Sequence, residues 1–114
     1  MKRAEAEGAA LLRERTRDPI ERMKVSAFSW KSGGFGLVGI LNVTIENNND
    51  FPVKDMSIEC TFSGKSGTDL STASHRIYDS IPAKAKRTFR DINIGLINSQ
   101  SARARCGLES ARRL

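Results

Sequence analysis

The sequence predicts an all-β fold, a single antiparallel β-sandwich of about six or seven short strands that follows a helical or flexible N-terminal lead. Its most informative stretch is residues 39–62, where two runs of alternating apolar and polar residues flank a polar connector that ends in proline. Side chains alternate between the faces of a strand, so each run has one dry face and one wet face. Turn-forming segments recur about every 8–12 residues, which is typical of a sandwich. A length of 114 residues leaves room for one domain.

The first 23 residues are predicted to form the lead, because they are rich in Ala, Glu, Leu and Arg and poor in β-branched residues. Asp18 and Pro19 favour one further helical turn, with the aspartate as the cap and the proline at the first helical position. The apolar content is low, so we expect residues 1–18 to be weakly tied to the domain. This composition also suits a stalk whose membrane anchor was lost upstream.

Each strand is predicted from an alternating run bounded by turn residues. In the second strand, for example, Leu41, Val43 and Ile45 share one apolar face. The sandwich is predicted to occupy residues 24–111 and to be followed by a free basic tail at 112–114. Its predicted strands span residues 25–30, 37–46, 53–62, 70–78, 86–94 and 102–110.

The fifth predicted strand contains a conflict of parity. Phe89 lies on one face of a regular strand, whereas Ile92 and Ile94 lie on the other. If all three side chains face the core, a β-bulge near Arg90 and Asp91 is required.

Positive charge is concentrated in the last third of the chain. Residues 81–114 contain eight basic and two acidic residues, whereas the net charge of the whole chain is +6. Such an excess suits an anionic partner, but it is also typical of a solvated strand face. The candidate residues for an anionic-partner surface are Lys86, Arg87, Arg103 and Arg105.

The two cysteines, Cys60 and Cys106, both fall on the apolar side of their predicted strands. Two inward-facing cysteines on different strands can meet in one core as a disulfide. The alternative is a pair of buried thiols that pack as small hydrophobic side chains.

Few residues suggest catalysis or metal binding. The single histidine, His75, lies in a Ser/Thr-rich strand without a nearby ligand or catalytic partner, and it is interpreted as a strand-edge or solvent-facing residue. We therefore expect no enzyme activity, no metal and no cofactor. Phe28, Trp30 and Phe35 flank Gly33-Gly34 and predict either an exposed aromatic patch or, for the first two, side chains on the core-facing side of the first strand.

The order of these motifs resembles that of the FxLYD-like, immunoglobulin-like β-sandwich domains of bacterial envelope proteins. The resemblance is carried by a strand ending at Asn47, the turn Phe51-Pro52, the element Ile81-Pro82-Ala83 and a strand that begins with Phe89. The Leu-Tyr-Asp motif that names the group is missing after Phe62. The resemblance implies an immunoglobulin-like topology, an exported or membrane-anchored module without catalysis, and neighbouring strands for the two cysteines. It thus favours a Cys60–Cys106 bridge.

Taken together, these features predict a non-enzymatic protein-interaction or structural module of a bacterial envelope protein, periplasmic or membrane-anchored, with an unidentified protein partner. The competing hypothesis is a small, basic, cytoplasmic β protein that binds nucleic acid. A nucleic-acid partner is the weaker expectation, because the last strand carries no aromatic side chain on which a base could stack.

Overall fold

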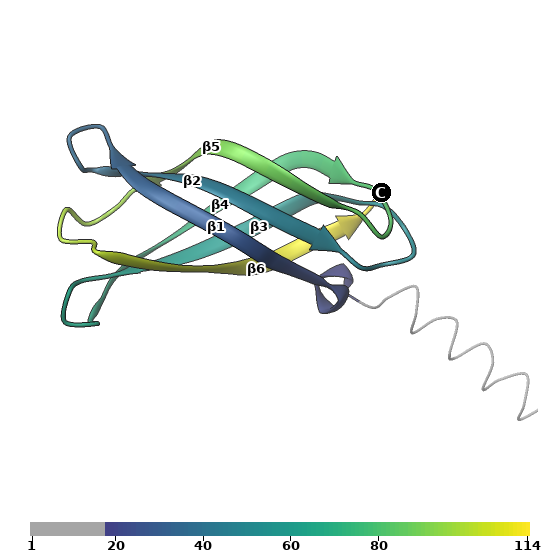
Figure 1. The fold of residues 1–114 in the computed structure, drawn as a ribbon, viewed down its shortest axis with the longest axis horizontal. Helices are drawn as coiled ribbons and strands as arrows, with labels where there is room; N and C mark the ends of the chain where they lie inside the picture. The colour runs from purple at the N-terminus through teal and green to yellow at the C-terminus, as the bar shows by residue number, and fades with distance from the viewer. Residues whose placement is uncertain (1–17) are drawn as a thin grey trace, which may run out of the picture.

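The computed structural model describes residues 18–114 and shows two three-stranded antiparallel sheets packed face to face, as the sequence predicted (Figure 1). Five of the six strands are longer than predicted, by up to five residues, because pairing with a neighbour extends them beyond their alternating apolar runs, whereas β2 has the predicted length. The first sheet has the order β1 (Met23–Gly33), β2 (Val38–Asn47), β5 (Lys86–Leu96), and the second has the order β4 (Asp69–Ile81), β3 (Val53–Ser63), β6 (Arg103–Arg113).

A single turn of 3-10 helix, η1 (Pro19–Arg22), precedes β1. The carboxylate of Asp18 accepts a hydrogen bond from the backbone N–H of Ile20 at 3.1 Å, which confirms the predicted cap and the proline at the start of the turn. The remainder of the predicted lead, residues 1–17, lies outside the described residues. Within residues 18–114, no helix has the length and hydrophobicity needed to cross a membrane.

The predicted free tail at residues 112–114 is wrong. Arg112 and Arg113 belong to β6, where they pair with Lys54 and Val53 of β3. The Arg113 guanidinium lies 4.3 Å from the centre of the Phe51 ring, and the backbone N–H of Leu114 donates to the Pro52 carbonyl at 3.0 Å. The two consecutive arginines suggested a solvated tail. Strand pairing uses backbone hydrogen bonds, however, so charged side chains that face solvent do not prevent it.

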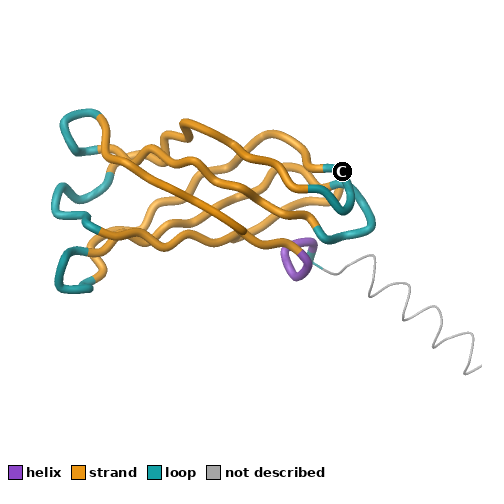
Figure 2. The backbone as a smooth tube through the Cα atoms, in the orientation of Figure 1, coloured by secondary structure: helices purple, strands orange, loops and turns teal. Residues whose placement is uncertain are grey.

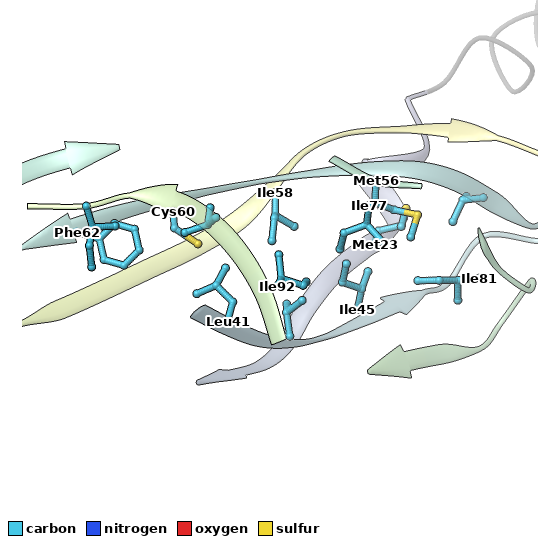
Figure 3. Packing of buried hydrophobic residues seen from close by; sticks show 14 residues of the cluster. Met23, Leu41, Ile45, Met56, Ile58, Cys60, Phe62, Ile77, Ile81 and Ile92 are labelled. Carbon is cyan, nitrogen blue, oxygen red and sulfur yellow. The ribbon is translucent and has the colours of Figure 1, made fainter. Parts of the chain in front are cut away.

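The core lies between the inner faces of the two sheets. The strict alternation of buried and partly exposed residues along β2 is the predicted pattern, with Leu41, Val43 and Ile45 buried. Figure 3 shows side chains of β2 and β5 facing those of β3. Trp30 packs edge-on against Phe62 with ring centres 5.2 Å apart, so it lies on the core-facing side as expected. The fully buried residues of β3 are Val53, Met56, Ile58, Cys60 and Phe62.

The predicted β-bulge in β5 is present. Leu41 pairs with Ile92, and Val43 pairs with Phe89, so two residues of β5 lie opposite one residue of β2. Asp91 has a positive φ of 55°, and its backbone N–H donates to the side-chain oxygen of Asn42 at 3.0 Å. The extra residue brings Phe89 onto the same side as the isoleucines that follow it.

A second bulge, in β3, was not predicted. Val53 and Met56 are both fully buried although they lie three residues apart, which a regular strand does not allow. The register shifts between Lys54 and Met56, and Asp55 has a φ of 51°. The bulge therefore lets both ends of β3 contribute to one core.

A disulfide joins Cys60 of β3 to Cys106 of β6. The two residues are direct partners in the β3–β6 register, with their Cα atoms 4.1 Å apart. Cys60 is fully buried, and Cys106 packs at the margin of the core. The bridge thus attaches an edge strand covalently to the centre of the second sheet.

The buried side chain of Asn47 holds together several segments that are distant in sequence. Its amide nitrogen donates to the carbonyls of Phe51, Ile81 and Pro82 at 3.0–3.2 Å, so two N–H groups serve three acceptors. Its oxygen accepts from both the backbone and the side chain of Asn49, whose own side chain donates to the Pro19 carbonyl. One asparagine therefore connects the β2–β3 and β4–β5 connections and, through Asn49, η1.

The elongated sandwich has two different ends (Figure 2). The Asn47 end carries η1, the C-terminus and the connections 48–52 and 82–85. The opposite end, which we call the Phe35 end, carries the turns at residues 34–37, 64–68 and 97–102. Both ends of the described chain therefore lie at the Asn47 end.

Replacing Asn47 with alanine should lower the free energy of unfolding by about 3 kcal/mol, because several buried polar groups lose their partners together. Asn48 is the matched control, since it is exposed and its contacts are made through its backbone. Asn48→Ala should change stability by no more than about 0.5 kcal/mol. Urea denaturation measures both values, and equal effects would contradict the role given to Asn47.

Removing the disulfide should also destabilise the domain. The bridge spans a sequence separation of 46 residues, for which the loop-entropy model gives about 4 kcal/mol. We expect the Cys60→Ala/Cys106→Ala variant to lose about 2–4 kcal/mol in urea denaturation. Mass spectrometry of an unreduced digest should contain the cross-linked peptide pair, and two free thiols in oxidised protein would disprove the bridge.

Candidate functional site

The structure does not gather the four predicted basic residues into one surface. Lys86 and Arg87 begin β5, an edge of the first sheet at the Asn47 end, where they pair with Glu46 and Ile45. Arg103 and Arg105 begin β6, an edge of the second sheet at the Phe35 end. The two groups therefore occupy opposite ends of the sandwich, and a single anionic partner would have to cover its length to touch both. That these residues bind an anion stays a prediction, and nothing in their arrangement favours nucleic acid.

Two of the four basic side chains are engaged in ion pairs within the domain. The Arg105 guanidinium makes a two-pronged pair with the carboxylate of Asp69, at 3.1 and 2.9 Å, across the outer face of β3. Arg87 donates to the Asp79 carboxylate at 2.6 Å and to the Ser80 carbonyl at 3.0 Å, which links β5 to β4 of the other sheet. These contacts indicate a structural role for both arginines.

The same contacts shift three pKa values. Hydrogen bonds from the Arg105 guanidinium, aided by its charge, hold the pKa of Asp69 below its usual value of 3.8, and the pair raises the pKa of Arg105. For Asp79, the backbone N–H of Ser80 is the main cause of a lowered pKa, and Arg87 adds to it. Both carboxylates are solvent-exposed, so these interactions are individually weak.

A shallow hollow of about 340 Å³ lies on the outer face of β3 and β6. Gly107 forms part of its lining because it has no side chain, and Glu59, Arg105 and Glu109 stand around it. Arg105 is already paired with Asp69, and the charged groups of opposite sign leave no dominant potential. The hollow therefore does not define a ligand class.

The turn between β1 and β2 presents a single aromatic side chain to solvent. Three consecutive residues, Gly34, Phe35 and Gly36, have positive φ angles of 56°, 62° and 82°. The turn is closed by hydrogen bonds to the Gly33 carbonyl from Gly36 and Leu37, each at 3.1 Å. The relative exposure of Phe35 is 104%, so its side chain is as accessible as in an extended peptide. The structure thus confirms an exposed aromatic at this turn.

Two leucines accompany Phe35. Leu37 is 49% exposed and Leu96 is 78% exposed, and they come from neighbouring segments because Val38 pairs with Leu96 and the Ile97 N–H donates to the Leu37 carbonyl at 2.8 Å. We call Phe35, Leu37 and Leu96 the hydrophobic tip. Large apolar side chains exposed together at one end of a soluble domain commonly mark an interaction site.

The hydrophobic tip rests on a closely packed base. Gly39, directly beneath it, is buried, and a Cβ atom there would come within 2.9 Å of the Ile94 side chain and 3.2 Å of the Phe62 ring. Ile94 and Ile97 are also buried at this end of the core. The base therefore holds the strands that carry the tip in a fixed arrangement.

Only part of this site was predictable from the sequence. The glycines around Phe35 indicated an exposed turn. The three aromatic residues of this region, Phe28, Trp30 and Phe35, do not form one patch. Trp30 packs in the core, and Phe28 is 38% exposed on an edge strand. No local signal revealed Leu96, because it lies beyond the predicted fifth strand and its position depends on pairing with Val38.

The sequence matches no model of a known protein family, and a search of curated proteins likewise found no match.

Acidification should destabilise the domain through Asp69 and Asp79. Their pKa values are lowered by folding, so their contribution is complete above about pH 5 and is lost as the pH falls through the lowered values. Asp69→Asn should therefore flatten the dependence of the free energy of unfolding on pH below about 4.

The arginine partners provide controls for this measurement. Arg105→Gln should flatten the pH curve as much as Asp69→Asn does, because the guanidinium is the main cause of the lowered pKa. Arg87→Gln should flatten it less than Asp79→Asn, because the Ser80 N–H remains. Urea denaturation between pH 2 and pH 6 measures all four variants, and a curve unchanged by Asp69→Asn would refute the assignment.

Proposed function

We propose that this chain is a non-enzymatic, immunoglobulin-like interaction module of a bacterial envelope protein, periplasmic or membrane-anchored. The observation that carries the proposal is the hydrophobic tip, which is exposed at the end of the sandwich opposite to both ends of the described chain. The three side chains of the tip add little to the stability of the domain, since each retains about half of its exposure or more. Their exposure is explained if they bind a partner.

The disulfide supports an exported location. A buried Cys60–Cys106 bridge suggests an oxidising, extracellular-type compartment, because cytosolic thiols are kept reduced in most organisms. The bacterial periplasm is such a compartment. The resemblance of the sequence to envelope domains favours it over other oxidising compartments.

The order of the strands supports the immunoglobulin-like part of the proposal. Strands β1, β2 and β5 form one sheet and β4, β3 and β6 the other, so the chain crosses between sheets after β2, β4 and β5. Immunoglobulin-like domains of the constant type also place their first, second and fifth strands in one sheet, but they add the fourth strand to that sheet, whereas β4 lies in the other sheet here. The loops at one end of such sandwiches are a recurring place for binding sites.

The compartment can be tested by trapping thiols in living cells. Acid quenching followed by alkylation should find Cys60 and Cys106 joined, and fractionation of the source organism should place the protein in the periplasm or the envelope. A cytoplasmic protein with both thiols free would contradict the proposal.

The interaction site can be tested in the same cells with a photoreactive phenylalanine analogue. The analogue at position 35 should form cross-links to a partner, because the Phe35 side chain is free of intramolecular contacts. Position 78 is the matched control, since Tyr78 is 79% exposed on an outer face away from the tip. Equal cross-linking at both positions would contradict a specific role for the tip.

A further inference from the structure

Phe35 occupies a backbone conformation that disfavours its own residue type. A φ of 62° in a turn is the left-handed region, which Gly adopts freely, Asn and Asp tolerate, and a bulky aromatic residue adopts with strain. The turn gains nothing from the ring, because the ring is fully exposed and the closing hydrogen bonds use backbone atoms alone. The aromatic side chain therefore serves something other than folding.

The hydrophobic tip protrudes rather than forming a groove. Phe35 is as accessible as in an extended peptide, and Leu96 retains 78% of its exposure. A projecting apolar group needs a partner that can close around it: either a protein with a matching pocket or a bilayer, whose interfacial region deforms around an inserted side chain. Phenylalanine and leucine suit either partner, so the charge at this end of the sandwich has to distinguish the two.

Unpaired positive charge lies at the same end of the sandwich as the tip. The turns at 34–37, 64–68 and 97–102 contain no acidic residue. Lys65 lies in the second of these turns, Arg103 is the first residue of β6, and Lys31 is the third residue from the end of β1. All three are exposed, and none forms an ion pair within residues 18–114. Asp69, the acidic residue nearest in sequence to these turns, is neutralised by Arg105.

We propose that the Phe35 end docks on an anionic lipid bilayer. The hydrophobic tip enters the interfacial region, while Lys31, Lys65 and Arg103 lie against the acidic headgroups. Insertion of the apolar side chains and electrostatic attraction of the basic residues are each weak. Together they are sufficient for reversible binding at the membrane surface. This inference rests on the proposed function, since it names the partner of the same tip.

The decisive variant is Phe35→Asn, because asparagine suits the left-handed backbone and removes the ring. Binding to vesicles of phosphatidylglycerol, measured by co-sedimentation at low salt, should fall about tenfold, while the melting temperature should stay the same or rise. Tyr78→Asn removes an exposed aromatic side chain elsewhere and should leave vesicle binding unchanged. If Phe35→Asn unfolds the protein, or leaves binding intact, the inference is wrong.

The depth of insertion can be measured with tryptophan. In Phe35→Trp, fluorescence should shift to the blue on anionic vesicles and be quenched by brominated acyl chains, as expected for an indole in the interfacial region. Tyr78→Trp should show neither change. Both variants share the background of Trp30, the only native tryptophan, so their difference reports the added residue alone.

The electrostatic contribution to binding can be tested by removing single positive charges at the Phe35 end and, as controls, at the Asn47 end. Lys31→Gln and Lys65→Gln should each weaken binding about fivefold, and added salt should weaken it further. Lys54→Gln and Lys86→Gln, at the Asn47 end, should have little effect. Equal losses at both ends would indicate adsorption by net charge alone and would overturn the assignment.

Three other outcomes would also overturn it: no binding to anionic vesicles, equal binding to phosphatidylcholine, or a solution dimer that Phe35→Asn dissociates. The first two would exclude an anionic bilayer, and the third would identify a second copy of the chain as the occupant. None of them bears on the oxidised state of the cysteines in cells, and cross-linking of position 35 to another protein would still support the interaction module. Failure of lipid docking is thus distinguishable from failure of the interaction-module proposal.

Discussion

The side chain of Asn47 is the constraint on which the arrangement of the sandwich depends. Two sheets that pack through apolar side chains are free to slide, because hydrophobic contact has no direction. Hydrogen bonds from a buried amide have direction, and those of Asn47 end on the connections that carry the chain from one sheet to the other. With Asn49 joined to the Pro19 carbonyl, the same network fixes the point at which the chain enters β1. A neutral buried amide serves this purpose well, since every partner is satisfied without a buried charge.

This concentration of polar contacts at one end leaves the other end free for a different task. At the Asn47 end, the connections 48–52 and 82–85 are held together by the Asn47 network and by Lys84, which pairs with Asp50 and donates to the Asn48 carbonyl. At the Phe35 end, backbone hydrogen bonds close the turns and join neighbouring segments, and Phe35, Leu37 and Leu96 are exposed. The cross-link between Cys60 and Cys106 lies between the two ends and holds β6 in register with β3. A rigid scaffold with binding groups on its turns is a common division of labour in proteins.

Local pattern was enough to predict the strands, because alternation and turn chemistry act over a few residues. It also located the bulge at Asp91, since parity alone showed that Phe89 and Ile92 could not share a face in a regular strand. What could not be predicted depends on register between distant strands. The pairing of Lys54 with Arg112, the ion pair between Asp69 and Arg105, and the exposure of Leu96 all follow from which strands are neighbours. The basic residues looked like one surface in the sequence, but β5 and β6 start at opposite ends of the sandwich.

The position of the chain ends has a mechanical consequence. Met23 begins β1 and Arg113 ends β6 at the same end of the sandwich, where each is paired with the neighbouring strand. A pulling force between them would load both edge strands in unzipping geometry, so that hydrogen bonds break one after another rather than together. On β6 the peeling would stop at Cys106, where the covalent bond to Cys60 transfers the load to the central strand. On β6 the lengthening would therefore be limited, and residues 103–105, which lie on the Phe35 side of the bridge, would stay paired with β3 while under tension.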